Sequence, residues 1–298
     1  MDLEQKAIER IRIASEMSLH HYGEPLVCTY SGGKDSDVML ELFKRAGVPF
    51  EVSHGLTTVD APQTVRHIKD TFRRLEDNCI KATIHKPKLS MWRLIEKNKF
   101  PPTRMARYCC SEYKENQNRN RMIATGVRWA ESTARADRQA FETVGSTKKT
   151  AIRLSEKMLM EDSDRSRALF EKCELKAKTI VNPIIDWPDS EIWDFYWHEC
   201  QAHNSLYSMG YSRVGCVGCP MASPKYRWKE FADFPKYKDA YIRVFGRMLE
   251  AIHAEGKPTK WKSGYDVFLW WMEDQNVEGQ ISLEELYGTE MIGGKDNG

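Results

Sequence analysis

The chain lacks any apolar run long enough to span a bilayer, and its N-terminus has no basic region followed by an apolar one. We therefore expect a cytoplasmic protein without membrane partners. It also lacks a charge excess, since 45 Lys and Arg oppose 43 Asp and Glu for a net charge of +2. No global field therefore indicates nucleic acid. Hydrophobic residues make up 41% of the 298 positions, which is enough for a core and excludes a disordered chain.

Cysteine is not scarce, but it is absent after Cys219, and residues 288–298 contain neither Cys nor His. In a cytosolic chain of this length, metal binding, catalysis or burial explains cysteines better than disulfides do. Four of the eight stand apart by their spacing. The other four, which we interpret as buried or incidental, are Cys28, Cys79, Cys173 and Cys200.

Short apolar runs alternate with amphipathic stretches along the first two thirds of the chain. The runs predict strands at 26–30, 50–54, 81–85, 122–127 and 179–184. The amphipathic stretches predict helices at 3–20, 35–45, 62–75 and 90–97. This alternation predicts an α/β fold with a doubly wound, mostly parallel sheet.

Composition changes suggest three parts. Residues 1–220 form the α/β domain, in which a polar, charge-dense stretch at 139–178 is interpreted as an insertion, either a lid or a helical excursion. Residues 221–287 are helical and aromatic, which predicts a C-terminal helical subdomain whose aromatic side chains form its core. The glycine-rich tail at 288–298 is predicted to be disordered.

The first predicted strand runs into Ser31-Gly32-Gly33-Lys34-Asp35-Ser36, and a predicted helix follows. Two glycines let successive amides point into one concavity, and the helix N-terminus adds partial positive charge. The serine hydroxyls and the Lys34 ammonium add donors for phosphate oxygens. An ordinary glycine turn with a capping Asp35 would not need this cluster. The spacing matches neither the Walker loop nor the Rossmann fingerprint.

Two close cysteine pairs, Cys109-Cys110 and Cys216-Val217-Gly218-Cys219, are well separated along the chain. Four thiolates of this kind can hold a [4Fe–4S] cluster or a tetrahedral zinc ion. Adjacent cysteines diverge, which suits a cluster better than zinc. The nearby Arg104, Arg107 and Arg213 would stabilise thiolates.

The loop resembles that of the PP-loop enzymes, and the wider pattern resembles the phosphoadenosine phosphosulfate (PAPS) reductase family over roughly Tyr22 to Pro220. The further matching motifs are Asp60-Ala61-Pro62-Gln63-Thr64, Cys109-Cys110, Gly126-Val127-Arg128-Trp129-Ala130-Glu131-Ser132-x-x-Arg135, Asn182-Pro183-Ile184-x-x-Trp187 and Gly210-Tyr211-Ser212-Arg213-Val214-Gly215-Cys216-x-x-Cys219. The resemblance implies the adenine-nucleotide α-hydrolase-like fold and binding of ATP, adenylyl sulfate (APS) or PAPS. The cysteine pattern is that of the cluster-bearing APS reductase branch.

Several residues of these motifs are candidates for the site. Gly126 ends a strand at the edge where parallel sheets hold ligands. Arg128 and Arg135 offer forked donors for phosphate or sulfate, and Glu131 and Ser132 could orient them or bind Mg²⁺. Ordinary surface ion pairs are the alternative for each of these residues. With Lys34 and Asp35, the two arginines form the predicted catalytic set.

One departure from the reductases concerns the nucleophile. Family reductases attack sulfur with a cysteine on a C-terminal Glu-Cys-Gly-x-His segment, which this sequence does not contain. The resemblance then favours sulfurtransferase-like members, including those of DNA phosphorothioation. These cleave ATP to AMP and pyrophosphate and take sulfur from a partner such as a cysteine desulfurase.

Two alternatives remain open: an assimilatory APS or PAPS reductase, and a non-catalytic nucleotide- and cluster-dependent sensor or assembly subunit. The acceptor is also open among tRNA, DNA, a small molecule and a protein. The basic residues Arg119, Arg121, Lys148 and Lys149 could form a nucleic-acid face, although a solvated helix explains them as well.

Overall fold

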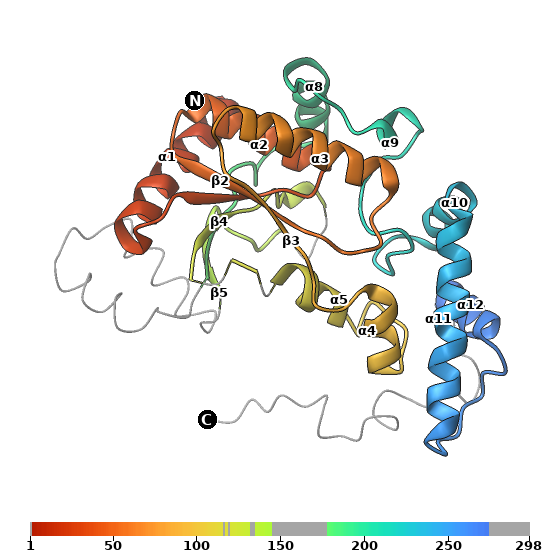
Figure 1. The fold of residues 1–298 in the computed structure, drawn as a ribbon. Helices are drawn as coiled ribbons and strands as arrows, with labels where there is room; N and C mark the ends of the chain where they lie inside the picture. Colours follow the sequence, from red (N-terminus) through yellow and green to blue (C-terminus); the bar gives the residue numbers. More distant parts are fainter. Residues whose placement is uncertain (1, 116, 119, 132–134, 145–177, 274–298) are drawn as a thin grey trace. The chain divides into compact units, whose positions relative to one another are not determined.

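The computed structural model describes residues 2–115, 117–118, 120–131, 135–144 and 178–273 (Figure 1). It divides into two compact units. Unit 1 comprises Met1–Lys88 and Cys110–Cys216, and unit 2 comprises Leu89–Cys109 and Val217–Gly298. The division therefore places residues 89–109 with the C-terminal helices, whereas the sequence suggested a single boundary after Pro220.

Unit 1 is built on a six-stranded sheet with the order β3-β2-β1-β4-β6-β5. Its strands are β1 (Leu26–Thr29), β2 (Phe50–Gly55), β3 (Ala82–His85), β4 (Met122–Ala124), β5 (Phe141–Val144) and β6 (Lys178–Val181). Every neighbouring pair is parallel except β5 and β6. The predicted mostly parallel sheet is confirmed.

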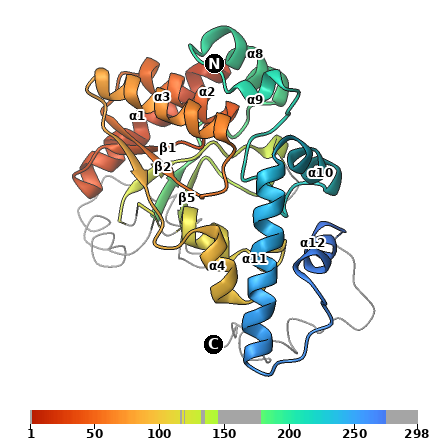
Figure 2. The ribbon, with the colours of Figure 1, turned by 45° about the vertical axis from the view of Figure 1, so that its right-hand side comes forward.

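Helices flank this sheet (Figures 1 and 2). The longer ones are α1 (Leu3–Tyr22), α2 (Lys34–Ala46), α3 (Pro62–Asp77) and α8 (Asp189–Glu199), and the short ones are α5 (Tyr108–Cys110), η1 (Ser111–Glu115), η2 (Trp129–Glu131) and α9 (Ser205–Ser208). α1 and α2 pack on β1, α3 packs on β3, and α8 packs on α2. The buried positions of α2 include Val38, Met39, Leu42 and Phe43, the apolar series that predicted this helix.

The strand β5 was not predicted. It lies at the start of the predicted insertion at 139–178 and pairs antiparallel with β6, with Phe141 opposite Val181. The remainder of that insertion, 145–177, and the predicted tail lie outside the described residues.

Unit 2 consists of α4 (Met91–Asn98), α10 (Pro224–Asp233), α11 (Pro235–Ala254) and α12 (Gly264–Glu273). α11 packs on α4 and α12. Phe231, Tyr241, Phe245 and Trp271 are each at most 2% exposed and contact one another, so these aromatics form the core of this unit, as predicted.

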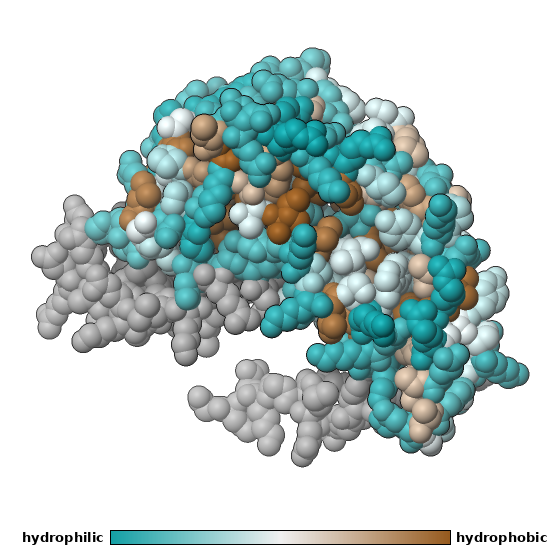
Figure 3. All heavy atoms as spheres, in the orientation of Figure 1, coloured by the Kyte–Doolittle hydropathy of each residue, from teal (hydrophilic) through white to brown (hydrophobic). Residues whose placement is uncertain are grey.

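In the part of the chain that the structure describes, no helix combines the length and the apolar character needed to cross a membrane. On the face seen in Figure 3, hydrophilic side chains cover most of the surface, and hydrophobic ones show through in separate patches.

Candidate functional site

The predicted phosphate loop, Ser31 to Gly33, connects β1 to α2. From β1 the chain continues to β2 and β3 on one side, and later returns to β4 on the other side. Open α/β sheets bind ligands beyond the carboxyl ends of their strands at such a switch point. The loop therefore lies where this topology favours a ligand.

Gly32 has a φ of +74°. A Cβ at this position would lie 2.8 Å from Ile68 Cγ1 and 3.1 Å from Thr64 Cγ2, both on α3. The left-handed conformation and the closeness of α3 both require glycine here.

We expect Gly32→Ala to lower the free energy of unfolding by about 2–4 kcal/mol, because conformational strain adds to overpacking. Gly47→Ala is the matched control. Gly47 has a similar φ of +66°, but an added Cβ would meet nothing within 4 Å. Urea denaturation of both variants measures the difference, and equal losses would contradict the role of the α3 contact.

Serine hydroxyls shape the loop from within. The Ser36 hydroxyl donates to the Gly33 carbonyl at 2.7 Å and accepts from the Gly33 amide at 3.1 Å. Ser31 Oγ donates to Ser36 Oγ at 3.3 Å. In this state the two serines hold the backbone curl that the sequence predicted for phosphate binding.

Lys34 and Asp35 form an ion pair at the start of α2. The Lys34 Nζ lies 3.0 Å from Asp35 Oδ2 and 5.2 Å from the centre of the Trp193 ring on α8. The Lys34 side chain is only 9% exposed, and that of Asp35 is 21% exposed. A poorly solvated ammonium next to a glycine loop is suited to hold an anion.

Arg128 is held by protein acceptors on three sides. Its Nε donates to Asp35 Oδ1 at 2.6 Å, one terminal nitrogen donates to the Trp187 carbonyl at 3.1 Å, and the other donates to Asp189 Oδ1 at 2.6 Å. Its side chain is 1% exposed. The guanidinium thus connects the loop to the start of α8, and its predicted role as a phosphate fork stays a prediction.

The remaining predicted residues lie near this ion-pair system. A Cβ on Gly126, just after β4, would lie 3.4 Å from Asp35 Cβ, so the backbone passes close to the loop. The Glu131 carboxylate forms an ion pair with Arg135 and accepts from the Arg128 amide at 3.2 Å. Ser132 lies outside the described residues.

Arg135 lies among other guanidinium groups. Its pKa is lowered, first by burial and then by Arg138, Arg213 and Arg128, while Asp35 acts in the opposite direction. Cations that repel one another beside a phosphate loop make the region favourable for a polyanion.

A buried polar group beneath the loop was not predicted. Asp37, on the first turn of α2, accepts a hydrogen bond from the Tyr30 hydroxyl, and its carboxylate oxygens lie 3.0 Å from His67 Nε2 on α3. The Tyr30 pKa is raised well above its usual value, by burial and then by Asp37. This group links β1, α2 and α3 directly behind the loop.

A second unpredicted contact comes from the segment after α8. The Asn204 amide group donates to the Gly32 carbonyl at 2.8 Å and to the Thr64 hydroxyl at 3.1 Å. The Tyr207 hydroxyl accepts from the Lys34 backbone amide at 2.7 Å. No motif at the sequence level indicated that these residues touch the loop.

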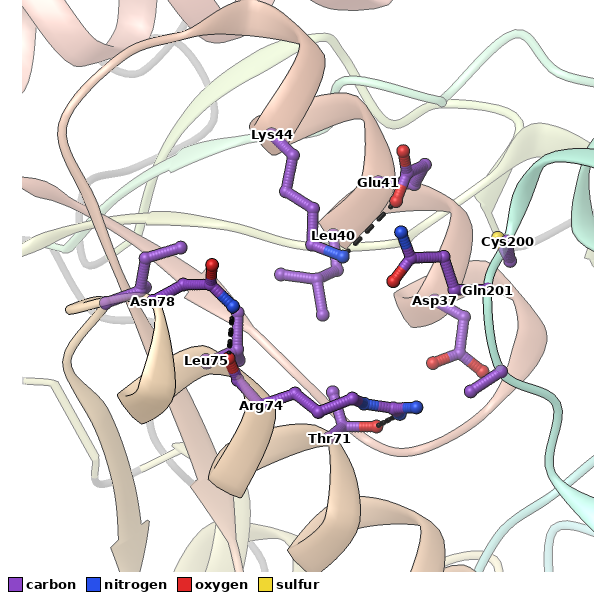
Figure 4. A pocket seen from close by; sticks show the side chains of 12 residues that line it. Asp37, Leu40, Glu41, Lys44, Thr71, Arg74, Leu75, Asn78, Cys200 and Gln201 are labelled. Carbon is purple, nitrogen blue, oxygen red and sulfur yellow. Dashed lines mark hydrogen bonds and ion pairs between the residues drawn. The ribbon is translucent and has the colours of Figure 1, made fainter.

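A cavity of about 310 Å³ lies elsewhere on unit 1, between α2, α3 and residues 200–202 (Figure 4). Lys44 pairs with Glu41 across it at 3.3 Å, and Arg74 donates to the Thr71 hydroxyl at 3.1 Å. Asp37 is the one residue of the 31–37 segment in its lining. This cavity is therefore separate from the glycine loop.

The predicted cluster ligands are divided between the two units. Cys110 and Cys216 belong to unit 1, and Cys109 and Cys219 belong to unit 2. All four thiols are partly exposed. In the described ranges, no three His, Cys, Asp or Glu side chains form a group that could hold a metal ion. By contrast, Cys28 is buried, and burial raises the pKa of its thiol.

Each unit fixes one end of the second cysteine pair. In unit 1, the Cys216 backbone forms a β-bridge with Asp60. In unit 2, the Gly218 amide donates to the buried Glu230 carboxylate at 2.8 Å, and the Val217 carbonyl accepts from the Tyr241 hydroxyl at 3.1 Å. The backbone around the pair is thus ordered by specific contacts.

Comparison with protein families matches residues 25–222 to the phosphoadenosine phosphosulfate reductase domain. The chain belongs to this family. An uncharacterized protein of Methanocaldococcus jannaschii is 23% identical over 286 residues, which cover 95% of this chain and 57% of that protein. The chain spans about half the length of the curated relatives it matches over most of its own length.

Two members with assigned activities also show similarity. Adenosine 5′-phosphosulfate reductase of Allochromatium vinosum is 38% identical over 42 residues, which cover 14% of this chain and 16% of that enzyme. Among solved structures, phosphoadenylyl-sulfate reductase from Candida auris, in complex with phosphate, gives a TM-score of 0.45 at 16% identity, covering 71% of this chain and 88% of that chain.

Proposed function

We propose that this PAPS reductase family member binds an adenine nucleotide on the Ser31–Ser36 loop and cleaves ATP to AMP and pyrophosphate, activating an acceptor for sulfur transfer. The observation that carries the proposal is the Lys34–Asp35 pair, with its poorly solvated ammonium at the start of α2, next to mutually repelling arginines. Such an excess of positive potential favours a triphosphate.

The chain's own groups would act electrostatically. The acceptor attacks the α-phosphorus, the bond to the bridging oxygen breaks, and pyrophosphate leaves with the electron pair. Lys34 and the loop amides stabilise the charge that develops on the phosphates. A sulfide-level sulfur from a donor such as a cysteine desulfurase then displaces AMP from the activated acceptor.

Asp35 fits a magnesium ligand. A carboxylate only accepts hydrogen bonds, and each oxygen keeps a second lone pair beyond its contacts with Lys34 and Arg128. Bound Mg²⁺ would neutralise charge on the phosphates. Among the other predicted residues, Arg135 and Glu131 flank this position as an ion pair.

The decisive experiment is pyrophosphate release from ATP by anaerobically purified full-length protein, with and without a sulfur donor. Release supports the proposal. Nucleotide binding without release in either condition would overturn it and support the alternative of a nucleotide-dependent sensor or assembly subunit.

Reduction of APS or PAPS to sulfite is a second candidate, favoured by the family match itself. It requires a thiolate that reaches the sulfate sulfur. Burial raises the pKa of both Cys28 and Cys200, which makes these two thiols poor nucleophiles. Sulfite formation from APS with thioredoxin as the reductant would establish this candidate in place of the first.

The four-cysteine cluster remains a proposal from the sequence. The thiol set suits iron and sulfide chemically, but the described side chains form no group of three ligands, so the mechanism above uses no cluster. We expect anaerobic protein to show a broad visible absorbance shoulder and about four irons per chain. Zinc without iron would contradict this prediction.

A further inference from the structure

The segment from Asn204 to Tyr207 reaches the glycine loop at two points. Asn204 donates to the Gly32 carbonyl, and the Tyr207 hydroxyl accepts from the Lys34 amide at 2.7 Å. The same hydroxyl would lie 3.4 Å from a Cβ placed on Gly33. A side-chain oxygen from a distant part of the chain thus lies directly on the candidate phosphate cradle.

The position of this hydroxyl is fixed by packing. The Tyr207 ring is 8% exposed and makes edge-on contacts with Trp193 and Tyr196, at centroid distances of 5.0 and 5.3 Å. The Tyr207 amide donates to the Asn204 carbonyl at 3.1 Å, and Asn204 is itself fully buried. Moving the phenol away would break contacts with both neighbouring rings, so the hydroxyl is preorganised.

The amide that Tyr207 engages has a special place. Lys34 is the first residue of α2, so its N–H is one of the donors that a helix leaves without an internal partner. Phosphate-binding loops direct such donors at their ligand. Here a phenolic oxygen takes that donor, and a hydroxyl that accepts one hydrogen bond can donate another.

We propose that Tyr207 is a phosphate-contacting residue, whose hydroxyl extends the cradle by accepting from the Lys34 amide and donating to an oxygen of the bound phosphate. The chain N–H to O–H to phosphate strengthens each of its bonds. The inference rests on the proposed nucleotide site and adds the ligand class, a phosphoanhydride rather than a nucleoside.

The test is calorimetric binding of ATP, inorganic pyrophosphate and adenosine to the full-length protein and its Tyr207→Phe variant. Loss of a hydrogen bond to a charged group predicts about 10- to 100-fold weaker binding of ATP and pyrophosphate. Adenosine binding is expected to stay unchanged. Tyr22→Phe is the matched control, because its hydroxyl bonds Thr179 at 2.8 Å, away from the loop.

Three results would overturn the inference. Tighter binding of pyrophosphate to Tyr207→Phe would mean that the hydroxyl competes with the ligand. Equal binding by both proteins would leave the tyrosine a purely structural role, as would a parallel loss of adenosine binding with a lowered melting temperature. Binding of neither phosphate ligand by the unaltered protein would remove the site itself. Weakened binding without pyrophosphate release by the unaltered protein would support this inference while the proposed reaction fails.

Discussion

Replacing Lys34 with methionine is expected to lower kcat/KM for pyrophosphate release from ATP by about 10²- to 10³-fold, the usual effect of removing one preorganised donor from a developing charge. The Lys34 ammonium is held in place by Asp35 at 3.0 Å and by the Trp193 ring. Methionine keeps an unbranched stem to fill the space. Asp35 still pairs with Arg128 in this variant, so no carboxylate is left without a cation.

Steady-state kinetics separate two roles for the ammonium. A loss in kcat would mean that Lys34 acts on the transition state, whereas a rise in KM alone would mean that it holds ATP equally well before and during the reaction. Lys44→Met is the matched control, since Lys44 lies on the same helix and pairs with Glu41 at 3.3 Å. Retention of activity within threefold in Lys34→Met would remove Lys34 from the mechanism.

Much of the fold could be predicted because local patterns and tertiary packing agree. The strands β1, β2 and β3 are apolar or β-branched runs between good helix signals, and α2 ends at Gly47 with a left-handed cap. The strand β5 was missed because Phe141-Glu142-Thr143-Val144 lies in charged surroundings. Its pairing with β6, some 40 residues later in the chain, has no local signal.

Less of the candidate site could be predicted, for a similar reason. Glycine, serine and lysine at fixed spacing indicated the loop, since phosphate binding by backbone amides needs those residue types together. Tyr207 escaped notice because its contact with Lys34 spans 173 residues. Asp37 escaped notice because only the fold brings His67 to it.

Arg128 shows how a correct neighbourhood can leave a role open. The sequence placed this arginine near the loop, and the structure brings its Nε within 2.6 Å of Asp35. Its other donors meet the Trp187 carbonyl and Asp189 rather than open solvent. A motif indicates that a cation is present, but not which acceptor it serves.

Arg128→Met is expected to lower the free energy of unfolding by about 3–5 kcal/mol, because removing one partner of a buried ion pair leaves the others uncompensated. The Arg128 side chain is 1% exposed, whereas Asp35 is 21% and Asp189 is 64% exposed. Water can resolvate Asp189, so the main cost arises at Asp35 and at the Trp187 carbonyl, which would lose their donor.

Urea denaturation without nucleotide measures this loss, with Arg73→Met as the matched control. Arg73 pairs with Asp70 at 3.3 Å, but its side chain is 71% exposed, so we expect a change within about 0.5 kcal/mol. A loss below about 1 kcal/mol in Arg128→Met would show that the buried network adds little to stability. In that case, weakened ATP binding by the folded variant would assign Arg128 to the ligand, as its motif first suggested, because the guanidinium would then have to turn from Asp35 towards phosphate when the site fills.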